Sequence, residues 1–364
     1  MPTTKPTTEL HRAGQSLWLD TITRDMISDG TLLRYIEDLA ITGLTSNPTI
    51  YQKAIAGTDA YDEQISDGHE LGLPDDDIYF ELAVSDLQRA ADALLSTYRR
   101  TDGVDGYVSL EVSPELAYET SATIRQAARL HHKADRPNFL IKIPGTPAGL
   151  PAIEESIFSG VPVNVTLLFT PAQYAAAAEA YMLGLERRLE AGLDVSVPSV
   201  ASLFVSRWDV AVADRVPDAL RNRLGVAIGR EAYRAYRELL ESDRWQRLAN
   251  FGARPQRLLF ASTGVKDPEA SDILYVRELA SPNTVNTMPE ATLLAFADHG
   301  VVDQSLPRDG GDAAEVLAAF EHQSIDIATL GQQLQDDGAA AFVSSWRQLI
   351  ERIGATRPAP APTR

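Results

Sequence analysis

Cysteine is absent from this chain of 364 residues, which excludes disulfide bonds, thiolate metal sites and a cysteine nucleophile. Long apolar runs are missing too, because no stretch approaches the roughly 18 apolar residues that a membrane-spanning helix needs. The first ten residues, MPTTKPTTEL, lack the apolar core of a signal peptide. We therefore expect a cytoplasmic protein that has no membrane partner.

Basic residues are fewer than acidic ones, 33 against 51, which leaves a net charge of −18 and an isoelectric point near 4.7. No basic run compensates for this charge, so we expect no nucleic-acid partner. The same charge means that an anionic substrate would need a local basic pocket.

Motifs that bind metals or nucleotides are also lacking. The six histidines lie outside the predicted strand ends, and no His-Glu-x-x-His pattern is present, so we expect no metal site. The chain has neither a Gly-x-Gly-x-x-Gly after its first strand nor a phosphate-binding P-loop. These absences give no support for a cofactor.

What the chain does have is a regular alternation of short apolar strands and helical segments. At several junctions a strand is followed by a helix-capping residue and a proline, as at Asn47-Pro48, Ser113-Pro114 and Thr170-Pro171. Strands that alternate with helices predict a parallel sheet, and eight of them predict a closed (β/α)8 TIM barrel. The eight predicted strands cover residues 16–20, 43–45, 107–112, 139–143, 161–169, 200–206, 258–263 and 283–287.

Two segments exceed a minimal barrel. Residues 209–253 carry an amphipathic stretch, which predicts an enlarged crossover between the sixth and seventh strands. Residues 313–353 follow the eighth strand and predict two or three helices, packed outside the barrel or across one of its ends. We expect one domain over residues 1–355 and a disordered Pro/Ala-rich tail over 356–364.

Lys142 is the only charged residue in the predicted fourth strand and the Pro-Gly turn after it, and it is one of only five lysines in the chain. An ammonium group in such an apolar setting must be paired, or it must lose its proton. A neutral amine can condense with a carbonyl to form a Schiff base. The alternative is a structural lysine paired with a carboxylate, and this context leaves both interpretations open.

Other polar residues lie near the carboxyl ends of the predicted strands, where barrels of this class place their chemistry. Alternation along the strands puts Asn164 and Thr166 on the inward face of the fifth strand. Each residue considered alone also fits a structural role, either as a helix cap or as a side chain that only packs within the barrel. Together they favour carbonyl chemistry around Lys142. The set comprises Asp20, Asn47, Glu111, Asn164, Thr166, Ser202, Phe204 and Ser262.

Two cations follow the sixth and seventh strands, where such barrels often bind phosphate. Arg207 and Lys266 are therefore predicted to recognise a phosphate group. The alternative is that Arg207 pairs with Asp209 and that Lys266 pairs with Asp267.

Seven motifs, in family order over most of residues 16–290, resemble those of the transaldolase family. The long sixth crossover and the segment that ends at Lys266 are most similar to the longer actinobacterial branch. The motifs are Ser16-Leu-Trp-Leu-Asp20, Gly43-Leu-Thr-Ser-Asn47-Pro48, Ser109-Leu-Glu111-Val, Ile141-Lys142-Ile-Pro-Gly-Thr146, Asn164-Val-Thr166-Leu-Leu-Phe169, Ser202-Leu-Phe-Val-Ser-Arg207 and Asn286-Thr-Met-Pro289.

The resemblance implies a cofactor-free transferase of the non-oxidative pentose phosphate pathway. Lys142 would form a Schiff base with sedoheptulose 7-phosphate or fructose 6-phosphate, and Asp20 would take the C4 hydroxyl proton as the C3–C4 bond breaks. The dihydroxyacetone unit left on Lys142 would then pass to glyceraldehyde 3-phosphate or erythrose 4-phosphate.

The resemblance also implies a role for each remaining residue. Glu111 and Thr166 would hold a water that shuttles protons. Three residues would orient the dihydroxyacetone hydroxyls, and two would bind phosphate. Many members have Ser-x-Arg after the seventh strand, whereas this chain has Lys266. A lysine ammonium is a mobile point charge and lacks the rigid planar set of donors that an arginine guanidinium presents. The hydroxyl-orienting residues are Asn47, Asn164 and Ser202, and the phosphate ligands are Arg207 and Ser262.

Three alternatives stay open at this point. The first is a class I aldolase that releases free dihydroxyacetone; Phe204 is a candidate for keeping water from the intermediate in a transferase. The second is a sugar-phosphate-binding barrel without catalysis. The third assigns residues 313–353 to a partner surface or to self-association, and the sequence leaves monomer and homodimer undecided.

Overall fold

Eight parallel strands close into a barrel in the computed structural model of the protein, which describes residues 5–356. Each strand pairs with the next along the chain, and β8 returns to β1. The predicted (β/α)8 barrel is confirmed. The strands are β1 (Gln15–Leu19), β2 (Ile41–Thr45), β3 (Tyr107–Glu111), β4 (Phe139–Pro144), β5 (Val163–Leu168), β6 (Ser199–Phe204), β7 (Arg257–Ala261) and β8 (Thr284–Met288).

The predicted junctions are correct in two of three cases. The Asn47 side chain accepts a hydrogen bond from the Ile50 amide and begins α4 (Pro48–Gly57), and Thr170 forms a capping box that begins α9 (Pro171–Glu190). At Ser113-Pro114 only a short 3-10 helix begins, η1 (Pro114–Leu116), and the Ser113 side chain makes no capping hydrogen bond, so the predicted cap is wrong. The next α-helix, α7 (Thr120–Ala134), begins six residues after Pro114.

The predicted enlarged crossover between β6 and β7 is present, and it contains α10, η2, α11 and α12. The remaining helices are α1 (Pro6–Arg12), α2 (Arg24–Ser28), α3 (Thr31–Asp38), α5 (Asp62–Glu70), α6 (Asp75–Arg100), α8 (Gly149–Phe158), α10 (Ser206–Val212), η2 (Asp218–Leu220), α11 (Leu224–Glu241), α12 (Asp243–Asn250), α13 (Leu274–Glu278), α14 (Glu290–His299), α15 (Ala313–His322) and α16 (Ile327–Ala355).

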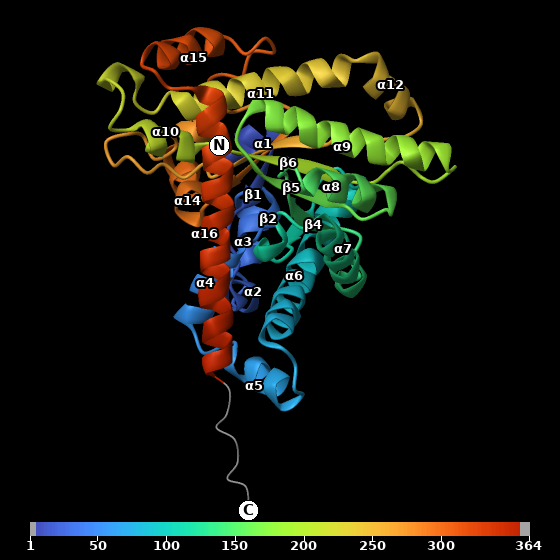
Figure 1. The fold of residues 1–364 in the computed structure, drawn as a ribbon. Helices are drawn as coiled ribbons and strands as arrows, with labels where there is room; N and C mark the ends of the chain where they lie inside the picture. The colour runs from blue at the N-terminus through green and yellow to red at the C-terminus, as the bar shows by residue number, and fades with distance from the viewer. Residues whose placement is uncertain (1–4, 357–364) are drawn as a thin grey trace, which may run out of the picture.

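The two C-terminal helices take different positions. Helix α15 packs against α11, whereas α16 crosses the front of the barrel in Figure 1 and contacts α4, α6 and β5. The amide of Gln335 in α16 donates to the carbonyls of Gly145, just after β4, and Leu167, near the end of β5. This places α16 across the carboxyl end of the strands. The single domain over 1–355 stays a prediction, and residues 357–364 of the predicted tail lie outside the described residues.

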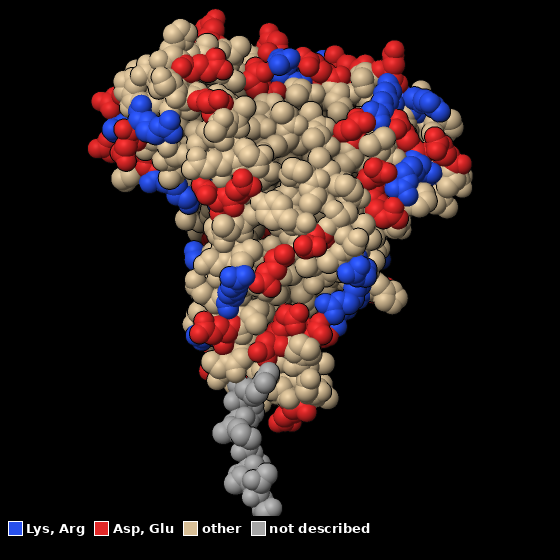
Figure 2. All heavy atoms as spheres, in the orientation of Figure 1, with Lys and Arg blue, Asp and Glu red and all other residues tan. Residues whose placement is uncertain are grey.

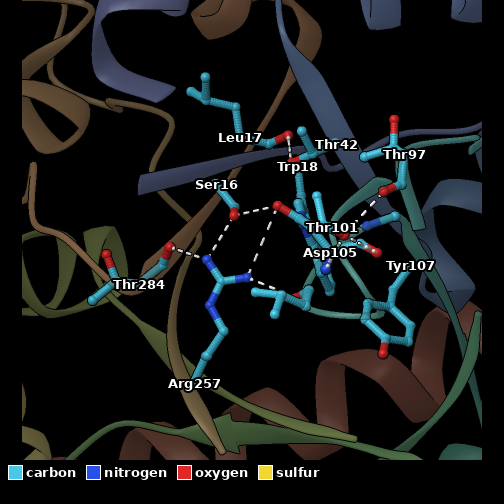
Figure 3. Close-up of polar contacts among 12 residues, drawn as sticks. Ser16, Leu17, Trp18, Thr42, Thr97, Thr101, Asp105, Tyr107, Arg257 and Thr284 are labelled. Atoms are coloured by element: carbon cyan, nitrogen blue, oxygen red, sulfur yellow. Dashed lines mark hydrogen bonds and ion pairs between the residues drawn. The ribbon is translucent and has the colours of Figure 1, made fainter. Parts of the chain in front are cut away.

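A buried polar cluster closes the opposite, amino-terminal end of the barrel (Figure 3). Asp105 accepts hydrogen bonds from the Ser16 hydroxyl and, at 2.8 Å, from the Trp18 indole. Arg257 donates to the Ser16 oxygen at 2.6 Å and to the Thr284 carbonyl at 2.7 Å. The sequence did not predict this cluster. Because its groups satisfy one another, it is a structural floor beneath the site at the other end.

Charged side chains of both signs interleave on the face shown in Figure 2. Among the ion pairs of the protein, Arg244 is 2.5 Å from Glu179 and 2.7 Å from Glu186, and Arg187 pairs with Glu154 and Glu155. Such pairs neutralise the arginines involved. No helix in residues 5–356 combines the length and the apolar character that a membrane crossing requires.

Candidate active site

A cavity of about 940 Å³ opens at the carboxyl ends of the strands. Its wall includes eight of the eleven predicted site residues. The other three, Glu111, Asn164 and Thr166, are fully buried and do not form part of the wall. The eight on the wall are Asp20, Asn47, Lys142, Ser202, Phe204, Arg207, Ser262 and Lys266.

Lys142 reaches this cavity from β4, although its side chain is almost completely buried, with 4% of the residue exposed. Its Nζ atom lies 3.3 Å from Oε2 of Glu111, on the neighbouring strand β3, and donates to the Ser46 carbonyl at 3.4 Å. The amine is therefore paired, as the structural interpretation requires. It also faces an open cavity, and a lysine with a purely structural role has no need of that access.

Burial raises the pKa of the Glu111 carboxyl; the positive charge of Lys142 lowers it in part, and the negative charge of Asp20 raises it. Apart from the Lys142 ammonium, no group in residues 5–356 is hydrogen-bonded to either carboxylate oxygen. The buried Thr166 hydroxyl likewise has no partner in the described part of the chain. Buried polar atoms of this kind need a ligand, and a water molecule or a substrate oxygen would supply one.

Asp20 comes directly after β1 and lines the cavity near Lys142 and Lys266. The Thr45 hydroxyl donates to Asp20 Oδ1 at 2.8 Å. Burial raises the pKa of Asp20, while Lys142, the Thr45 hydrogen bond and Lys266 lower it in part. The alternative role of Asp20 as a helix cap is taken by Thr23, whose hydroxyl accepts from the Met26 amide.

A chain of hydrogen bonds crosses the barrel from β6 to β3. The Ser202 hydroxyl donates to Asn164 Oδ1 at 2.7 Å, and the Asn164 amide donates to the Ser109 oxygen at 3.0 Å. Asn164 lies opposite Lys142 in the β4–β5 register and faces inward, as the strand alternation predicts. It is fully buried behind Ser202, so only Ser202 of this chain reaches the cavity wall.

Arg207 begins the first turn of α10, and its guanidinium carbon lies 5.6 Å from the Phe204 ring centroid and 6.0 Å from that of Phe342. Burial lowers its pKa. The alternative pairing with Asp209 is not found, because that carboxylate accepts from the Leu224 and Gly225 amides and from the Tyr275 hydroxyl. Arg207 has no salt bridge with any described carboxylate.

The loop after β7 brings two more polar groups to the same side of the cavity. The Ser262 hydroxyl lies 2.9 Å from that of Ser206, and Ser262 has a φ of +55°, in the left-handed region that few non-glycine residues adopt. Lys266 is exposed and makes no ion pair with Asp267, whose carboxylate accepts instead from Asn222 and from the Glu269 amide. Arg207 and Lys266 are thus cations at the cavity that form no salt bridge with a carboxylate in residues 5–356, although the charge of Asp337 acts on Arg207 and that of Asp20 on Lys266.

Several cavity residues were not found from the sequence. Thr45 and Thr287, whose hydroxyls are 2.7 Å apart, could have been inferred from strand alternation, because both stand near strand ends. The wall residues of α4 and α16 had no such signal, because strand alternation does not predict which side chains of a helix face a cavity. These residues include Lys53 from α4, and Leu334, Asp337 and Phe342 from α16.

Comparison with known proteins gives a consistent result. Residues 17–353 match the profile of the family described as "Transaldolase/Fructose-6-phosphate aldolase". The chain is 46% identical over 357 residues to a protein named "Transaldolase" from Thermobifida fusca, covering 96% of this chain and 97% of that one. It is 45% identical to a "Transaldolase" from Parafrankia sp., with the same coverage. A "Transaldolase 2" from Nostoc sp. is 40% identical, covering 95% of this chain and 96% of the relative.

Proposed function

The chain belongs to the transaldolase/fructose-6-phosphate aldolase family, and from that premise we propose that it is a transaldolase that works through a Schiff base on Lys142. The observation that carries the proposal is the placement of this buried amine. The amine faces the cavity, and its Nζ atom lies 3.3 Å from the Glu111 carboxylate. A second carboxyl group, Asp20, is close enough for the Lys142 charge to lower its pKa in part. A nucleophilic amine beside two proton-accepting groups has what imine formation and carbon–carbon cleavage both need.

In the first step the Lys142 amine attacks the C2 carbonyl of a ketose phosphate. The carbinolamine then loses its oxygen as water, which requires proton transfers at nitrogen and oxygen. Glu111 is close enough to exchange a proton with the amine, and its raised pKa suits it to hold that proton. The unpartnered Thr166 hydroxyl supports a role for this residue in holding the water that carries protons.

In the second step Asp20 removes the proton of the C4 hydroxyl. The C3–C4 bond breaks, and its electron pair moves into the protonated imine, which becomes an enamine. An aldose phosphate leaves, and the three-carbon unit stays on Lys142. The enamine then attacks the aldehyde of the second aldose phosphate, and Asp20 returns its proton to the new hydroxyl. Water adds to C2 of the resulting imine, and the C–N bond breaks to release the ketose phosphate and the Lys142 amine. Burial raises the pKa of Asp20. The Asp20 carboxylate is therefore a stronger base than the carboxylate of an exposed aspartate.

Binding is assigned to the remaining wall residues. Asn47 and Ser202 orient the hydroxyls of the dihydroxyacetone unit, and Asn164 holds Ser202 from behind. The phosphate binds to Arg207, which offers a fixed fork, with Ser262 and the more mobile Lys266. These cations form a local basic region in a chain of net charge −18.

The assigned substrates follow from the family. The donors are sedoheptulose 7-phosphate and fructose 6-phosphate, and the acceptors are glyceraldehyde 3-phosphate and erythrose 4-phosphate. The reaction needs no cofactor and belongs to the non-oxidative pentose phosphate pathway, and we propose a cytoplasmic location in keeping with that pathway.

The direct test is borohydride reduction in the presence of fructose 6-phosphate, followed by peptide mass mapping. We expect a three-carbon adduct on Lys142, and sedoheptulose 7-phosphate as a product when erythrose 4-phosphate is added. Lys142→Ala is expected to fold but to form no adduct and no product. A folded wild-type protein that binds the sugar without any adduct would overturn the proposal. An adduct on Lys266 would assign the chemistry to a different strand.

A further inference from the structure

The last helix contributes an aromatic ring to the cavity. Phe342 of α16 is 4% exposed, and its ring centroid lies 5.8 Å from Lys142 Nζ and 6.0 Å from the guanidinium carbon of Arg207. The ring therefore lies close both to the amine and to the cation to which we assign the phosphate. A ketose phosphate that reaches both groups must pass alongside this ring.

Two more apolar side chains lie on the cavity wall. They are Leu334, two turns earlier in α16, and Phe204 of β6. Phe204 packs in turn on Phe169, with ring centroids 5.3 Å apart. The polar groups on this wall include Asp337 and Arg207. None of the three apolar side chains offers a hydrogen-bonding group, so a water in contact with Phe342 gains no partner from them.

The position of the Phe342 ring is firmly held relative to the strands. Gln335 is 1% exposed and donates to the Gly145 carbonyl at 3.1 Å and to the Leu167 carbonyl at 2.8 Å. At Gly338 a Cβ atom would lie 3.0 Å from the Leu167 side chain and 3.3 Å from Arg207, so the helix approaches as closely as a glycine allows. Beyond Phe342, the Thr49 hydroxyl of α4 donates to Ser345 at 2.8 Å.

We propose that Phe342 is a specificity-determining residue, whose ring keeps water from the three-carbon intermediate on Lys142 and so favours its transfer over its release. This rests on the proposed transaldolase function. Release needs a proton on C3 of the enamine, which gives an imine; water then adds to C2, and the C–N bond breaks to give dihydroxyacetone and the free amine. Transfer forms a bond from C3 to the acceptor aldehyde instead. Both branches end with hydrolysis of an imine, so they differ only at C3, which takes a proton in release and the acceptor carbon in transfer. Keeping away a water that could deliver a proton to C3 therefore slows release selectively.

The test compares Phe342→Ala, Phe342→Leu and Val343→Ala with the wild type. Each protein receives fructose 6-phosphate with and without erythrose 4-phosphate, and free dihydroxyacetone and sedoheptulose 7-phosphate are measured by chromatography. Phe342→Ala is expected to raise the ratio of release to transfer about tenfold, a difference of about 1.4 kcal/mol between the two barriers. Phe342→Leu restores an apolar wall and should stay close to the wild type. Val343→Ala, on the half-exposed outer side of α16, should leave the ratio unchanged.

An unchanged ratio in folded Phe342→Ala protein would overturn the inference. So would the loss of release together with transfer, because Phe342 would then be needed only to build the site. If Phe342→Ala does not fold, Phe342→Val takes its place under the same criteria. Failure of the proposed function itself is seen separately, as a wild-type protein that forms neither the Lys142 adduct nor the transfer product.

Discussion

Gln335 donates a hydrogen bond to the carbonyl oxygen of Leu167 at 2.8 Å, although 168 residues separate the two in the chain. Leu167 has a φ of +59°, in the left-handed region that a residue of this shape rarely adopts. It follows Thr166 directly. The last helix thus supports the strained backbone from which a residue assigned to proton transfer projects.

We expect Gln335→Ala to lower the free energy of unfolding by about 1–3 kcal/mol, because the Leu167 and Gly145 carbonyls would lose a buried donor. Since Thr166 would be less well placed, kcat should fall more than KM changes. Urea unfolding and steady-state kinetics measure the two effects. Gln333→Ala, two residues earlier on the exposed side of α16, is the control. Equal stability of the two variants would contradict the assigned role of Gln335.

Replacing Asp20 with asparagine should separate imine formation from bond cleavage. Asparagine cannot accept the C4 proton, so kcat is expected to fall by about 10²–10⁴-fold with little change in sugar binding. Borohydride reduction of Asp20→Asn with fructose 6-phosphate should trap the intact six-carbon sugar on Lys142 rather than the three-carbon unit. The adduct mass provides the measurement.

Thr23→Ala is the matched control, because Thr23 caps the helix next to Asp20. Loss of the cap should cost about 1 kcal/mol of stability and leave a three-carbon adduct. A three-carbon adduct in Asp20→Asn as well would assign the proton transfer to another group.

The pH profile of kcat/KM should depend on Lys266. Asp20 must be ionised to accept a proton, so activity falls as the pH drops through its pKa, which burial raises. The positive charge of Lys266 lowers that pKa in part. Lys266→Met removes this charge, so the pKa of Asp20 rises further and the acid limb of the profile moves to higher pH.

The control for the pH experiment is Arg207→Met. Arg207 is not among the groups that shift the pKa of Asp20, so this variant should raise KM for phosphorylated sugars and leave the acid limb in place. The profiles are measured over a range that extends below the limb of the wild type. A limb that stays in place in Lys266→Met, or that moves to lower pH, would remove Lys266 from the environment of Asp20.

Gly43 should not tolerate a methyl group. A Cβ atom at this position would lie 2.4 Å from atoms of the Trp18 indole, which is fully buried and hydrogen-bonded to Asp105. Gly43→Ala is expected to lower the free energy of unfolding by about 1–3 kcal/mol through overpacking. At Gly57 nothing lies within 4 Å, so Gly57→Ala should be neutral or slightly stabilising. Denaturant midpoints compare the two, and equal midpoints would show that the barrel adjusts freely around Trp18.

Local patterns were enough to predict the barrel and eight of the residues that line its cavity. The alternation of residues along β5 places Asn164 inward, and the parallel order of the strands brings the ends of β1, β4 and β6 to one edge. Asp20, Lys142 and Ser202 therefore had to lie near one another in any closed barrel of this kind. Their periodicity and their position at strand ends are properties of a few neighbouring residues, which a sequence displays directly.

Long-range packing decided the rest. The sequence left Arg207 free to pair with Asp209, but the folded chain uses Asp209 to cap α11, and so Arg207 stays available to a ligand. Phe342 and Gln335 entered the site only because α16 crosses the barrel mouth, and its amphipathic pattern fits an outer face equally well. A helix position depends on the shape of surfaces built by distant segments, and no local periodicity records that shape. The sequence by itself therefore determined the barrel and the residues at its strand ends, while the tertiary structure decided which side chains close the cavity above them.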